Sequence, residues 1–395
     1  MQQLKTISEN INLSNKNIFL RVDFNCPIEK STITDDTKII KMKSIISGFL
    51  KKNAKLILCS HLGRPQKKGK DGLSFKPLVQ SIEKILDQKL TFIEDFLNAS
   101  TKDKIKSSEN KIFLLENIRF FKEEEANDKN FGKQLASLAD IYVNEAFSCS
   151  HRAHASVSAI TSYLDSYAGK TIVDELNSLN KIFDSKSGAT MCIIGGSKIS
   201  TKIDLILNLI PKAKYLVIGG AMGNNFIKHN KFNIGKSLYE ENKDKLITEI
   251  INKAKQSNCE LITPVDVVVS ENMNTKGETK NLNEISENDI IFDIGSKTSQ
   301  KIKSAIDKTK MVLWNGPLGL FEKDYFLDGT KQVAEYIKMK TRNKSLVSVA
   351  GGGDTAAAIK KSNCLDGFSY ISTAGGAFLE LLEGKTLPGL KVLEK

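Results

Sequence analysis

Short apolar runs alternate with longer stretches of helical periodicity along the whole chain. In the first half the runs are rich in β-branched and aromatic residues, which is typical of buried strands. They predict strands at 18–24, 55–60, 112–117 and 141–147. The stretches between these runs predict helices at 37–52, 76–88 and 128–139. This alternation favours a parallel sheet that is covered by helices on both faces.

The second half of the chain repeats the same alternation. Its apolar runs predict strands at 190–196, 215–220, 261–270, 311–316, 346–352 and 370–376. Its helical patterns predict helices at 200–209, 240–257, 328–338, 354–361 and 376–383. Each half has its own strands, and 395 residues suit two domains. We therefore expect an α/β protein of two doubly wound, Rossmann-like parallel-sheet domains.

The same pattern suggests where the domains divide. We expect an N-terminal domain at 1–171 and a C-terminal domain at 185–380. The helical stretch around TIVDELNSLNKIF has no low-complexity character, so a helical hinge is predicted at 172–184. The tail at 381–395 contains proline and glycine, and we expect it to return towards the N-terminal domain.

Composition narrows the class of protein. The formal net charge is +12, but the basic residues are dispersed, and the densest run, KKGK at 67–70, is typical of a solvated loop. No helix-turn-helix, zinc or RNP-like signature is present, so nucleic-acid binding is a minor hypothesis. An anionic small substrate would use the positive field equally well.

Location and redox state follow from further absences in the sequence. No apolar run approaches the ~20 residues that span a bilayer, and the N-terminus lacks an apolar signal region. We therefore expect a cytoplasmic protein without a membrane partner. The six cysteines form no CxxC pair, so we interpret them as reduced, buried small hydrophobes rather than metal ligands.

Arginine and histidine gather in the first half, at predicted strand ends. Only five of the 58 basic residues are arginines: Arg21, Arg64, Arg119, Arg152 and Arg342. Arginine grips phosphate and carboxylate with a rigid fork, so four arginines within the first 152 residues suggest an oxyanion site. Structural salt bridges are the alternative, and the arginines alone do not decide. Three of the four histidines share these strand ends: His61, His151 and His154. The combined set points to a phosphorylated carboxylic acid.

Glycine clusters follow four predicted strands of the second half. They are Gly195–Gly196, Gly219–Gly220, Gly351–Gly353 and Gly375–Gly376. Such turns let backbone N–H groups approach phosphates at a helix N-terminus, although tight strand-to-helix turns need glycine anyway. Neither a Walker A loop nor GxGxxG after the first strand is present, which disfavours P-loop kinases and Rossmann dehydrogenases.

Three charged residues beside these glycines suggest nucleotide chemistry. Asp354 opens an alanine-rich helix, where it can be an N-cap, a Mg²⁺ ligand or partly both. Lys198 and Lys202 are four residues apart, which would place them on one helix face beside a phosphate. A solvated helix face is the alternative for the two lysines.

The motifs in their order resemble the phosphoglycerate kinase family over nearly the whole chain. The matching blocks are RVDFNCP, ITDDTK, SHLGRP, ENIRFFKEEEAND, NEAFSCSHRAHAS, GGSKISTK, DIGSKT, WNGPLGLFE, GGGDTAA and ISTAGGAFLELLEG. The resemblance implies a glycolytic, monomeric phosphotransferase that converts 1,3-bisphosphoglycerate and ADP into 3-phosphoglycerate and ATP. It also implies that the N-terminal domain binds the acid and that the C-terminal domain binds Mg-ADP or Mg-ATP. The domains would close for the reaction, which would proceed by charge neutralisation and need no general base.

The resemblance assigns roles to residues of this sequence. Acid binding would fall to Asp23, Phe24, Asn25, Lys38, His61, Leu62, Gly63, Arg64, Arg119 and Arg152. Nucleotide binding would fall to Lys202, Gly220, Gly295, Asn315, Pro317, Glu322, Gly352, Gly353, Asp354 and Thr355. Asp354 would also hold Mg²⁺. The transferring phosphate would be met by Lys198, Lys38 and the amides of Gly375 and Gly376.

The chain departs from the family pattern at a few positions. Lys38 stands where the family usually has arginine beside the transferring group. Such an arginine raises the rate about 10³–10⁵-fold in other phosphotransferases. The lysine at position 38 therefore leaves the type of reaction unchanged but puts the turnover rate in question. The lesser departures are Glu145 for aspartate, Ser296 for proline and Ala374 for glycine. A phosphotransferase for another acid and a non-enzymatic binder remain as alternatives.

Overall fold

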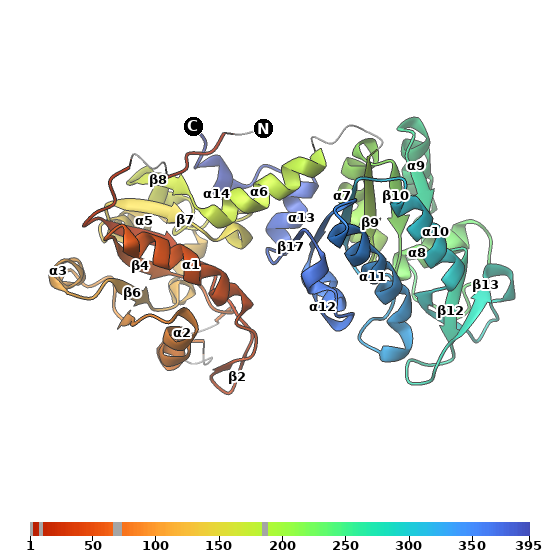
Figure 1. The fold of residues 1–395 in the computed structure, drawn as a ribbon, viewed down its shortest axis with the longest axis horizontal. Helices are drawn as coiled ribbons and strands as arrows, with labels where there is room; N and C mark the ends of the chain where they lie inside the picture. Colours follow the sequence, from red (N-terminus) through yellow and green to blue (C-terminus); the bar gives the residue numbers. More distant parts are fainter. Residues whose placement is uncertain (1–2, 8–10, 66–72, 184–188) are drawn as a thin grey trace. The chain divides into compact units, whose positions relative to one another are not determined.

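The computed structural model describes residues 3–7, 11–65, 73–183 and 189–395 (Figure 1). The basic run at 67–70 and residue 184 of the predicted hinge lie outside these ranges. The chain forms two compact units. Unit 1 comprises Met1–Leu176 and Thr386–Lys395, and unit 2 comprises Asn177–Lys385. Both are α/β units built on a six-stranded parallel sheet, as the alternating pattern predicts.

The sheet of unit 1 has the strand order β5-β6-β4-β1-β7-β8, and all its pairs are parallel. The strands are β1 (Asn17–Arg21), β4 (Lys55–Cys59), β5 (Thr91–Ile93), β6 (Ile112–Leu115), β7 (Ile141–Asn144) and β8 (Asp165–Ala168). A small hairpin, β2 (Ile28–Glu29) and β3 (Thr32–Ile33), follows β1. The helices are α1 (Thr37–Lys51), α2 (Val79–Leu86), α3 (Thr101–Ser107), α4 (Lys122–Glu125) and α5 (Lys129–Ala136). Helix α6 (Lys170–Phe183) begins in unit 1 and ends in unit 2.

Alternate residues of these strands enter one core. Leu20, Leu58 and Val143 point to the face that α1 and α2 cover with residues such as Ile46 and Ile82, and all five are fully buried. A parallel sheet that is buried on both faces needs near-continuous apolar strands, which explains why the short apolar runs located them. The strands β5 and β8 are short and partly polar, and the pattern did not predict them.

The end of the chain, Thr386–Lys395, belongs to unit 1. Its short helix α14 (Pro388–Lys391) packs on the loop after β7, where the Gly389 N–H donates to the Ser150 carbonyl at 2.8 Å. A Cβ at Gly389 would lie 2.7 Å from Val157, so glycine is needed for this close approach. Leu4 and Glu394 form a β-bridge beyond it.

Unit 2 has a second parallel sheet, ordered β11-β10-β9-β15-β16-β17. The strands are β9 (Thr190–Ile194), β10 (Tyr215–Ile218), β11 (Glu260–Ile262), β15 (Met311–Asn315), β16 (Val347–Gly351) and β17 (Tyr370–Ser372). The helices are α7 (Ile203–Leu209), α8 (Ala221–His229), α9 (Asp244–Gln256), α10 (Ser296–Ile306), α11 (Asp328–Arg342), α12 (Gly353–Lys361) and α13 (Gly376–Leu382). Residues of α10, α11 and α12 pack with Trp314 and Ile193 in one core.

The predicted strand at 261–270 is wrong. The segment breaks at Pro264, which has no N–H for a sheet ladder. Before the break β11 belongs to the main sheet, whereas β12 (Asp266–Ser270) is the middle strand of a separate antiparallel sheet. Its neighbours are β13 (Glu278–Asn281) and β14 (Ile290–Ile294).

The pattern also missed α8 and α10. Helix α8 contains Gly223, Asn224 and Asn225, which are poor helix formers. In the structure both asparagine side chains are buried and donate to the carbonyls of Leu238 and Glu240, at 2.9 and 2.7 Å. Tertiary hydrogen bonds therefore hold a helix that local propensity does not indicate.

Helix α6 contains the division between the units, between Leu176 and Asn177. Its first turn is capped from a distance by Glu145, which follows β7. The Glu145 carboxylate accepts the backbone N–H groups of Lys170 and Thr171 at 2.9 and 2.7 Å, and the Thr171 hydroxyl. Within the described ranges, no helix is long and apolar enough to cross a membrane.

Candidate functional site

The carboxyl edge of the unit 1 sheet collects most of the predicted acid-binding residues. Strand β1 lies between β4 and β7, and the chain changes direction across the sheet there. Ligands of doubly wound sheets bind at such a switch point. The segments after β1, β4, β6 and β7 carry nine of the ten predicted residues, and Lys38 comes from the first turn of α1.

Asp23 organises the centre of this edge. Its carboxylate accepts the Lys38 ammonium at 2.8 Å, the Ser148 hydroxyl at 2.6 Å and the Asn25 N–H at 3.0 Å. Burial alone would raise the pKa of Asp23, but Lys38 and His61 hold that pKa below its usual value. Asp23 therefore stays ionised and fixes Lys38 in place. Sequence reasoning did not single out Ser148, although it lies within the quoted block NEAFSCSHRAHAS.

A second chain of hydrogen bonds ties the loops together. The Gly63 N–H donates to the Asn25 side-chain oxygen at 2.8 Å, and the Gly63 carbonyl accepts from the Arg119 guanidinium at 2.6 Å. Gly63 has a φ of +59°, which favours glycine. Arg119 is nearly buried, and its Nε lies 3.6 Å from the Glu125 carboxylate. Three loops thus hold Arg119 in one orientation.

Phe24 and Leu62 are oriented by packing. Both side chains are fully buried in the core of unit 1. The Phe24 N–H donates to the Ser60 hydroxyl at 2.8 Å, and the Leu62 N–H donates to the Asn117 side chain at 3.1 Å. Only their backbone atoms could contact a ligand.

The remaining cations make this edge electropositive. Arg64 is exposed, and Arg152 is half-buried and donates to His151 at 3.1 Å. Burial, followed by Arg119, Arg21 and Arg152, lowers the pKa of His154 to about 4. Burial comes first, but the three arginines lower this pKa as well, and a positive field of this kind is suited to an anion.

The carboxyl edge of the unit 2 sheet is formed mainly by backbone. Gly196, Gly220 and Gly352 follow β9, β10 and β16 with φ values of +142°, +64° and +99°. A Cβ at Gly220 would lie 2.7 Å from the Gly196 carbonyl oxygen. Gly353 is exposed, and a Cβ there would meet no atom within 4 Å. The three glycines with positive φ are needed for the turns, whereas Gly353 leaves open space beside the turn after β16.

Lys202 joins the ends of two strands of this sheet, β9 and β15. Its ammonium donates to the Gly195 carbonyl at 2.7 Å and to the Asn315 side-chain oxygen at 2.6 Å. Burial lowers the pKa of Lys202 to about 8, and Asp354 opposes that shift. The Asn315 side-chain NH₂ donates in turn to the Gly351 carbonyl at 2.7 Å. The Thr355 hydroxyl accepts the Gly316 N–H at 2.7 Å.

The four-residue spacing predicted that Lys198 and Lys202 share one helix face, and this prediction is wrong. The backbone of Lys198 is extended, with φ −130° and ψ 122°, and the 3₁₀ helix Ile199–Lys202 begins after it. The spacing rule for helix pairs therefore does not hold here. Lys198 is exposed, while Lys202 reaches between the strand ends.

A cavity of about 390 Å³ lies beside these turns. Gly196, Gly220 and Asp354 line one part of it, and Pro317 and Glu322 also belong to its wall. The apolar part is lined by Leu238, Pro264, Ile290, Phe292, Leu320 and Phe321. A nucleotide has the same division into phosphates and a flat base. Gly295 lies outside this lining and packs against Asp266, where a Cβ would be 2.2 Å from the carboxyl carbon.

Known proteins share this architecture and these motifs. The phosphoglycerate kinase family profile matches residues 8–385. The chain belongs to the phosphoglycerate kinase family. It is 44% identical over 386 residues to the phosphoglycerate kinase of Wolbachia pipientis subsp. Culex pipiens (strain wPip), covering 97% of each chain. It is 44% identical over 398 residues to that of Orientia tsutsugamushi (strain Ikeda), covering 100% of this chain and 98% of the other.

Solved structures agree with this placement. The phosphoglycerate kinase from Coxiella burnetii superposes with a TM-score of 0.89 at 36% identity, covering 99% of both chains. The enzyme from Pyrococcus horikoshii OT3 gives a TM-score of 0.81 at 28% identity, covering 98% of both. The two-unit fold is therefore that of the phosphoglycerate kinase family.

The position that matches the family's metal ligand fits Mg²⁺. Asp354 is exposed in the first turn of α12 and lines the cavity, while Gly352 is the N-cap residue. The N-cap interpretation of Asp354 is therefore wrong. Among the described residues, no group of three or more histidine, cysteine, aspartate or glutamate side chains could hold a metal. Mg²⁺ on a nucleotide needs only one or two carboxylates besides phosphates and water.

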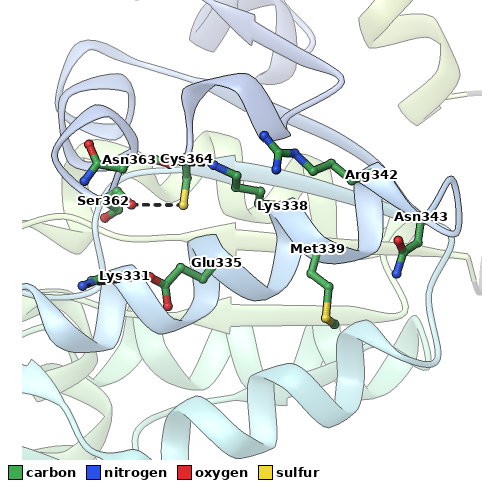
Figure 2. Close-up of a pocket in the computed structure, with 9 residues that line it drawn as sticks. All are labelled: Lys331, Glu335, Lys338, Met339, Arg342, Asn343, Ser362, Asn363 and Cys364. Carbon is green, nitrogen blue, oxygen red and sulfur yellow. Dashed lines mark hydrogen bonds and ion pairs between the residues drawn. The ribbon is translucent and has the colours of Figure 1, made fainter.

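A second cavity of unit 2, of about 470 Å³, lies along α11 (Figure 2). Lys331, Glu335 and Arg342 line it from α11, and the segment after α12 closes the other side. The ammonium of Lys338 lies 2.8 Å from the Asp366 carboxylate, which Arg342 also contacts. No residue matched to a family site lies here, and its charges are already paired on a solvent-exposed surface.

Proposed function

We propose that this chain catalyses reversible phosphoryl transfer from 1,3-bisphosphoglycerate to ADP, giving 3-phosphoglycerate and ATP. One observation carries the proposal. In a chain of the phosphoglycerate kinase family, one parallel sheet ends in a cationic side-chain cluster, and the other ends in glycine turns beside a part-apolar cavity. These two half-sites suit an acid phosphate and a nucleotide, respectively.

Unit 1 is the proposed acid-binding unit, corresponding to 1–171 with the returning tail. Arg64, Arg119 and Arg152 would grip the phosphate and carboxylate of the acid, since guanidinium groups bind both in a bidentate manner. Arg119 is already held by the Gly63 carbonyl. This preorganisation reduces the entropy lost on binding. Asn25 and His61 would complete the contacts to the acid.

Unit 2 is the proposed nucleotide-binding unit, corresponding to 185–380. The apolar lining of its cavity would take the base, and the Gly352–Gly353 turn would admit the phosphates at the N-terminus of α12. Lys202 and Thr355 would hold that turn, and Asp354 would hold Mg²⁺. When bound, Mg²⁺ would neutralise charge on the phosphate oxygens.

The chemistry requires no general base. The attacking group is a carboxylate, which is ionised at pH 7 because its pKa lies near ~4. Catalysis then consists of alignment and charge neutralisation. Lys38, Lys198 and the amides of Gly375 and Gly376 would meet the transferring phosphoryl group. The reaction requires both substrates to meet in line and away from water, which is the proposed role of a hinge at 172–184.

The finer properties are proposals as well. We propose a cytoplasmic monomer that uses Mg²⁺ with ADP or ATP. The positive net charge then serves the two anionic substrates rather than a nucleic acid.

The deciding experiment is steady-state transfer from ATP to 3-phosphoglycerate with Mg²⁺. Arg152→Ala should lower kcat/KM for the acid about 100-fold or more, because a charge-assisted contact is lost. Arg342→Ala is the matched control, because Arg342 contacts Asp366 in unit 2. If the folded wild-type protein binds nucleotide but transfers no phosphate, the proposal fails and a nucleotide binder remains.

A further inference from the structure

Arg21 is a fully buried arginine beneath the acid half-site, at the end of β1. It is 1% exposed. Its Nε donates to the Ser156 hydroxyl at 2.8 Å, and one terminal nitrogen donates to the Val22 carbonyl at 2.6 Å. The other terminal nitrogen faces two groups: His61 Nδ1 at 3.4 Å and the Cys149 sulfur at 3.6 Å.

Hydrogen bonds to Ser156, and from Ser156 to Glu124, hold the Arg21 guanidinium in place. Ser156, which accepts from Arg21, donates its own hydroxyl to the Glu124 carboxylate at 2.6 Å. Glu124 is completely buried and also accepts the Ser156 N–H at 2.8 Å. This relay fixes the plane of the guanidinium, and hence the direction in which it donates towards His61.

The contact dictates which nitrogen of His61 carries the proton. A guanidinium has only donors, so the His61 Nδ1 facing it must offer a lone pair. Cys149 lies 3.6 Å from the same Nδ1, and its thiol can either donate there or accept. A proton on Nδ1 would point at a cation. The remaining ring proton therefore belongs on Nε2, at the opposite side of the ring.

The surroundings also keep the ring uncharged. His61 is faced by Arg21 and Asp23 from the β1 side, Arg119 after β6, Lys38 on α1 and Cys149 after β7. Burial, followed by Arg21, holds the pKa of His61 well below its usual value, while Asp23 opposes. Arg119 and Lys38 lower that pKa further.

We infer that Arg21 is a positioning residue that fixes His61 as the neutral tautomer with its proton on Nε2. His61 then offers one hydrogen-bond donor of constant charge to an oxygen of the acid. This last step rests on the proposed function, whereas the tautomer itself does not. Arg21 acts through His61 and through neither substrate.

The tautomer is measured directly in the wild-type protein. With ¹⁵N-labelled histidine, two-bond ¹H–¹⁵N correlations distinguish the two neutral tautomers and the charged ring, and substitution of each of the four histidines assigns the signals. We expect His61 as the Nε2–H form from pH 5.5 to 8, while a histidine in a short reference peptide in the same tube titrates near ~6.5. A proton on Nδ1, or a charged ring at pH 7, overturns the inference.

Two variants separate the neighbours of Nδ1. Cys149→Ala removes the thiol and should leave the Nε2–H tautomer unchanged, since Arg21 remains. Arg21→Gln removes the cation, and the Nδ1–H form or a titrating ring should then appear. An unchanged His61 spectrum in folded Arg21→Gln shows that Arg21 does not set the tautomer. If Arg21→Gln does not fold, Cys149→Ala decides, because a switched tautomer there assigns the control to the thiol.

Binding of 3-phosphoglycerate tests the use of the donor. His61→Leu should raise the Kd about 10- to 100-fold, because a hydrogen bond to a charged ligand is lost. His61→Gln keeps an N–H donor and should bind more tightly than His61→Leu. Equal binding by both variants refutes the donor role. If the wild type shows the Nε2–H tautomer but does not bind 3-phosphoglycerate, the proposed function fails and the tautomer inference stands.

Discussion

The two half-sites are built by different means. In unit 1, charged side chains form the site and are paired before any ligand arrives, as Lys38 with Asp23 and Arg119 with the Gly63 carbonyl. In unit 2, backbone turns form the site, and Gly353 leaves open space. A side-chain site should be sensitive to charge and reach, whereas a backbone site should be sensitive to a single added methyl group.

The largest expected effect is on the stability of unit 2. Gly220→Ala would place a Cβ 2.7 Å from the Gly196 carbonyl oxygen at a φ of +64°. With ψ at −162°, Gly220 lies in a backbone region that essentially only glycine adopts, which costs about 1–3 kcal/mol for alanine, and the backbone contact adds to it. We expect a loss of about 3 kcal/mol in the free energy of unfolding. Urea denaturation measures this loss, and an unchanged midpoint would contradict the assignment of Gly220 to the turn.

The next expected effect is on ADP binding and should leave the fold unchanged. Gly353→Ala meets no protein atom within 4 Å, and Gly353 has no positive φ, so the protein should fold normally. The methyl group would occupy the space that the phosphates approach, and we expect the Kd for ADP to rise about 100-fold, or roughly 2.8 kcal/mol.

Gly48→Ala is the matched control for this methyl group. It lies on the exposed side of α1 in unit 1 and also meets no atom within 4 Å. We expect unchanged ADP binding and a gain of about 0.5–1 kcal/mol in stability, because alanine suits a helix interior better than glycine. Calorimetry with ADP, beside thermal melts, tests both variants. Normal ADP binding by Gly353→Ala would remove the Gly352–Gly353 turn from the nucleotide site.

Sequence reasoning located the sheet edges that carry both half-sites, but not the hydrogen bonds that hold the residues of each half-site in place. Because the strands are apolar runs, the residues that follow them, such as His61 and Asp354, could be placed at sheet edges. The antiparallel sheet was missed because β13 is the polar segment ETKN and pairs through tertiary context. Arg21 counted as one more strand-end arginine, since no spacing rule shows that it points inwards.

An exchange of one cationic side chain for another in unit 1 should have a smaller effect. Lys38→Arg restores a guanidinium where Lys38 contacts Asp23 at 2.8 Å. A fork can hold Asp23 and still reach the transferring phosphoryl group, so we expect kcat to rise about tenfold, well below the ~10³–10⁵ known for arginine fingers. Lys41→Arg, one turn along α1, should change little. A fall in kcat would contradict the expected gain from a guanidinium at position 38, and activity that appears only in Lys38→Arg would show that the native chain is a binder.

The smallest effect concerns pH and again differs between the half-sites. In unit 2 the pKa of Lys202 is lowered to about 8, so roughly nine in ten Lys202 groups are charged at pH 7 and roughly one in ten at pH 9. Nucleotide phosphates favour the charged form, and ADP binding should therefore take up protons near pH 8. We expect the Kd for ADP to rise by up to about tenfold from pH 7 to pH 9.

Stability should move in the opposite direction with pH when no nucleotide is present. Between about pH 8 and the unfolded lysine pKa near 10.4, the unfolded chain binds more protons than the folded one, so stability rises with pH. Lys202→Met should abolish both the proton uptake and this rise, whereas Lys255→Met on the exposed side of α9 should abolish neither. Calorimetry of ADP binding in buffers of different ionisation enthalpy measures the uptake. If Lys202→Met retained it, another group of unit 2 would be the one that titrates, and Lys202 would serve only to hold Gly195 and Asn315 together.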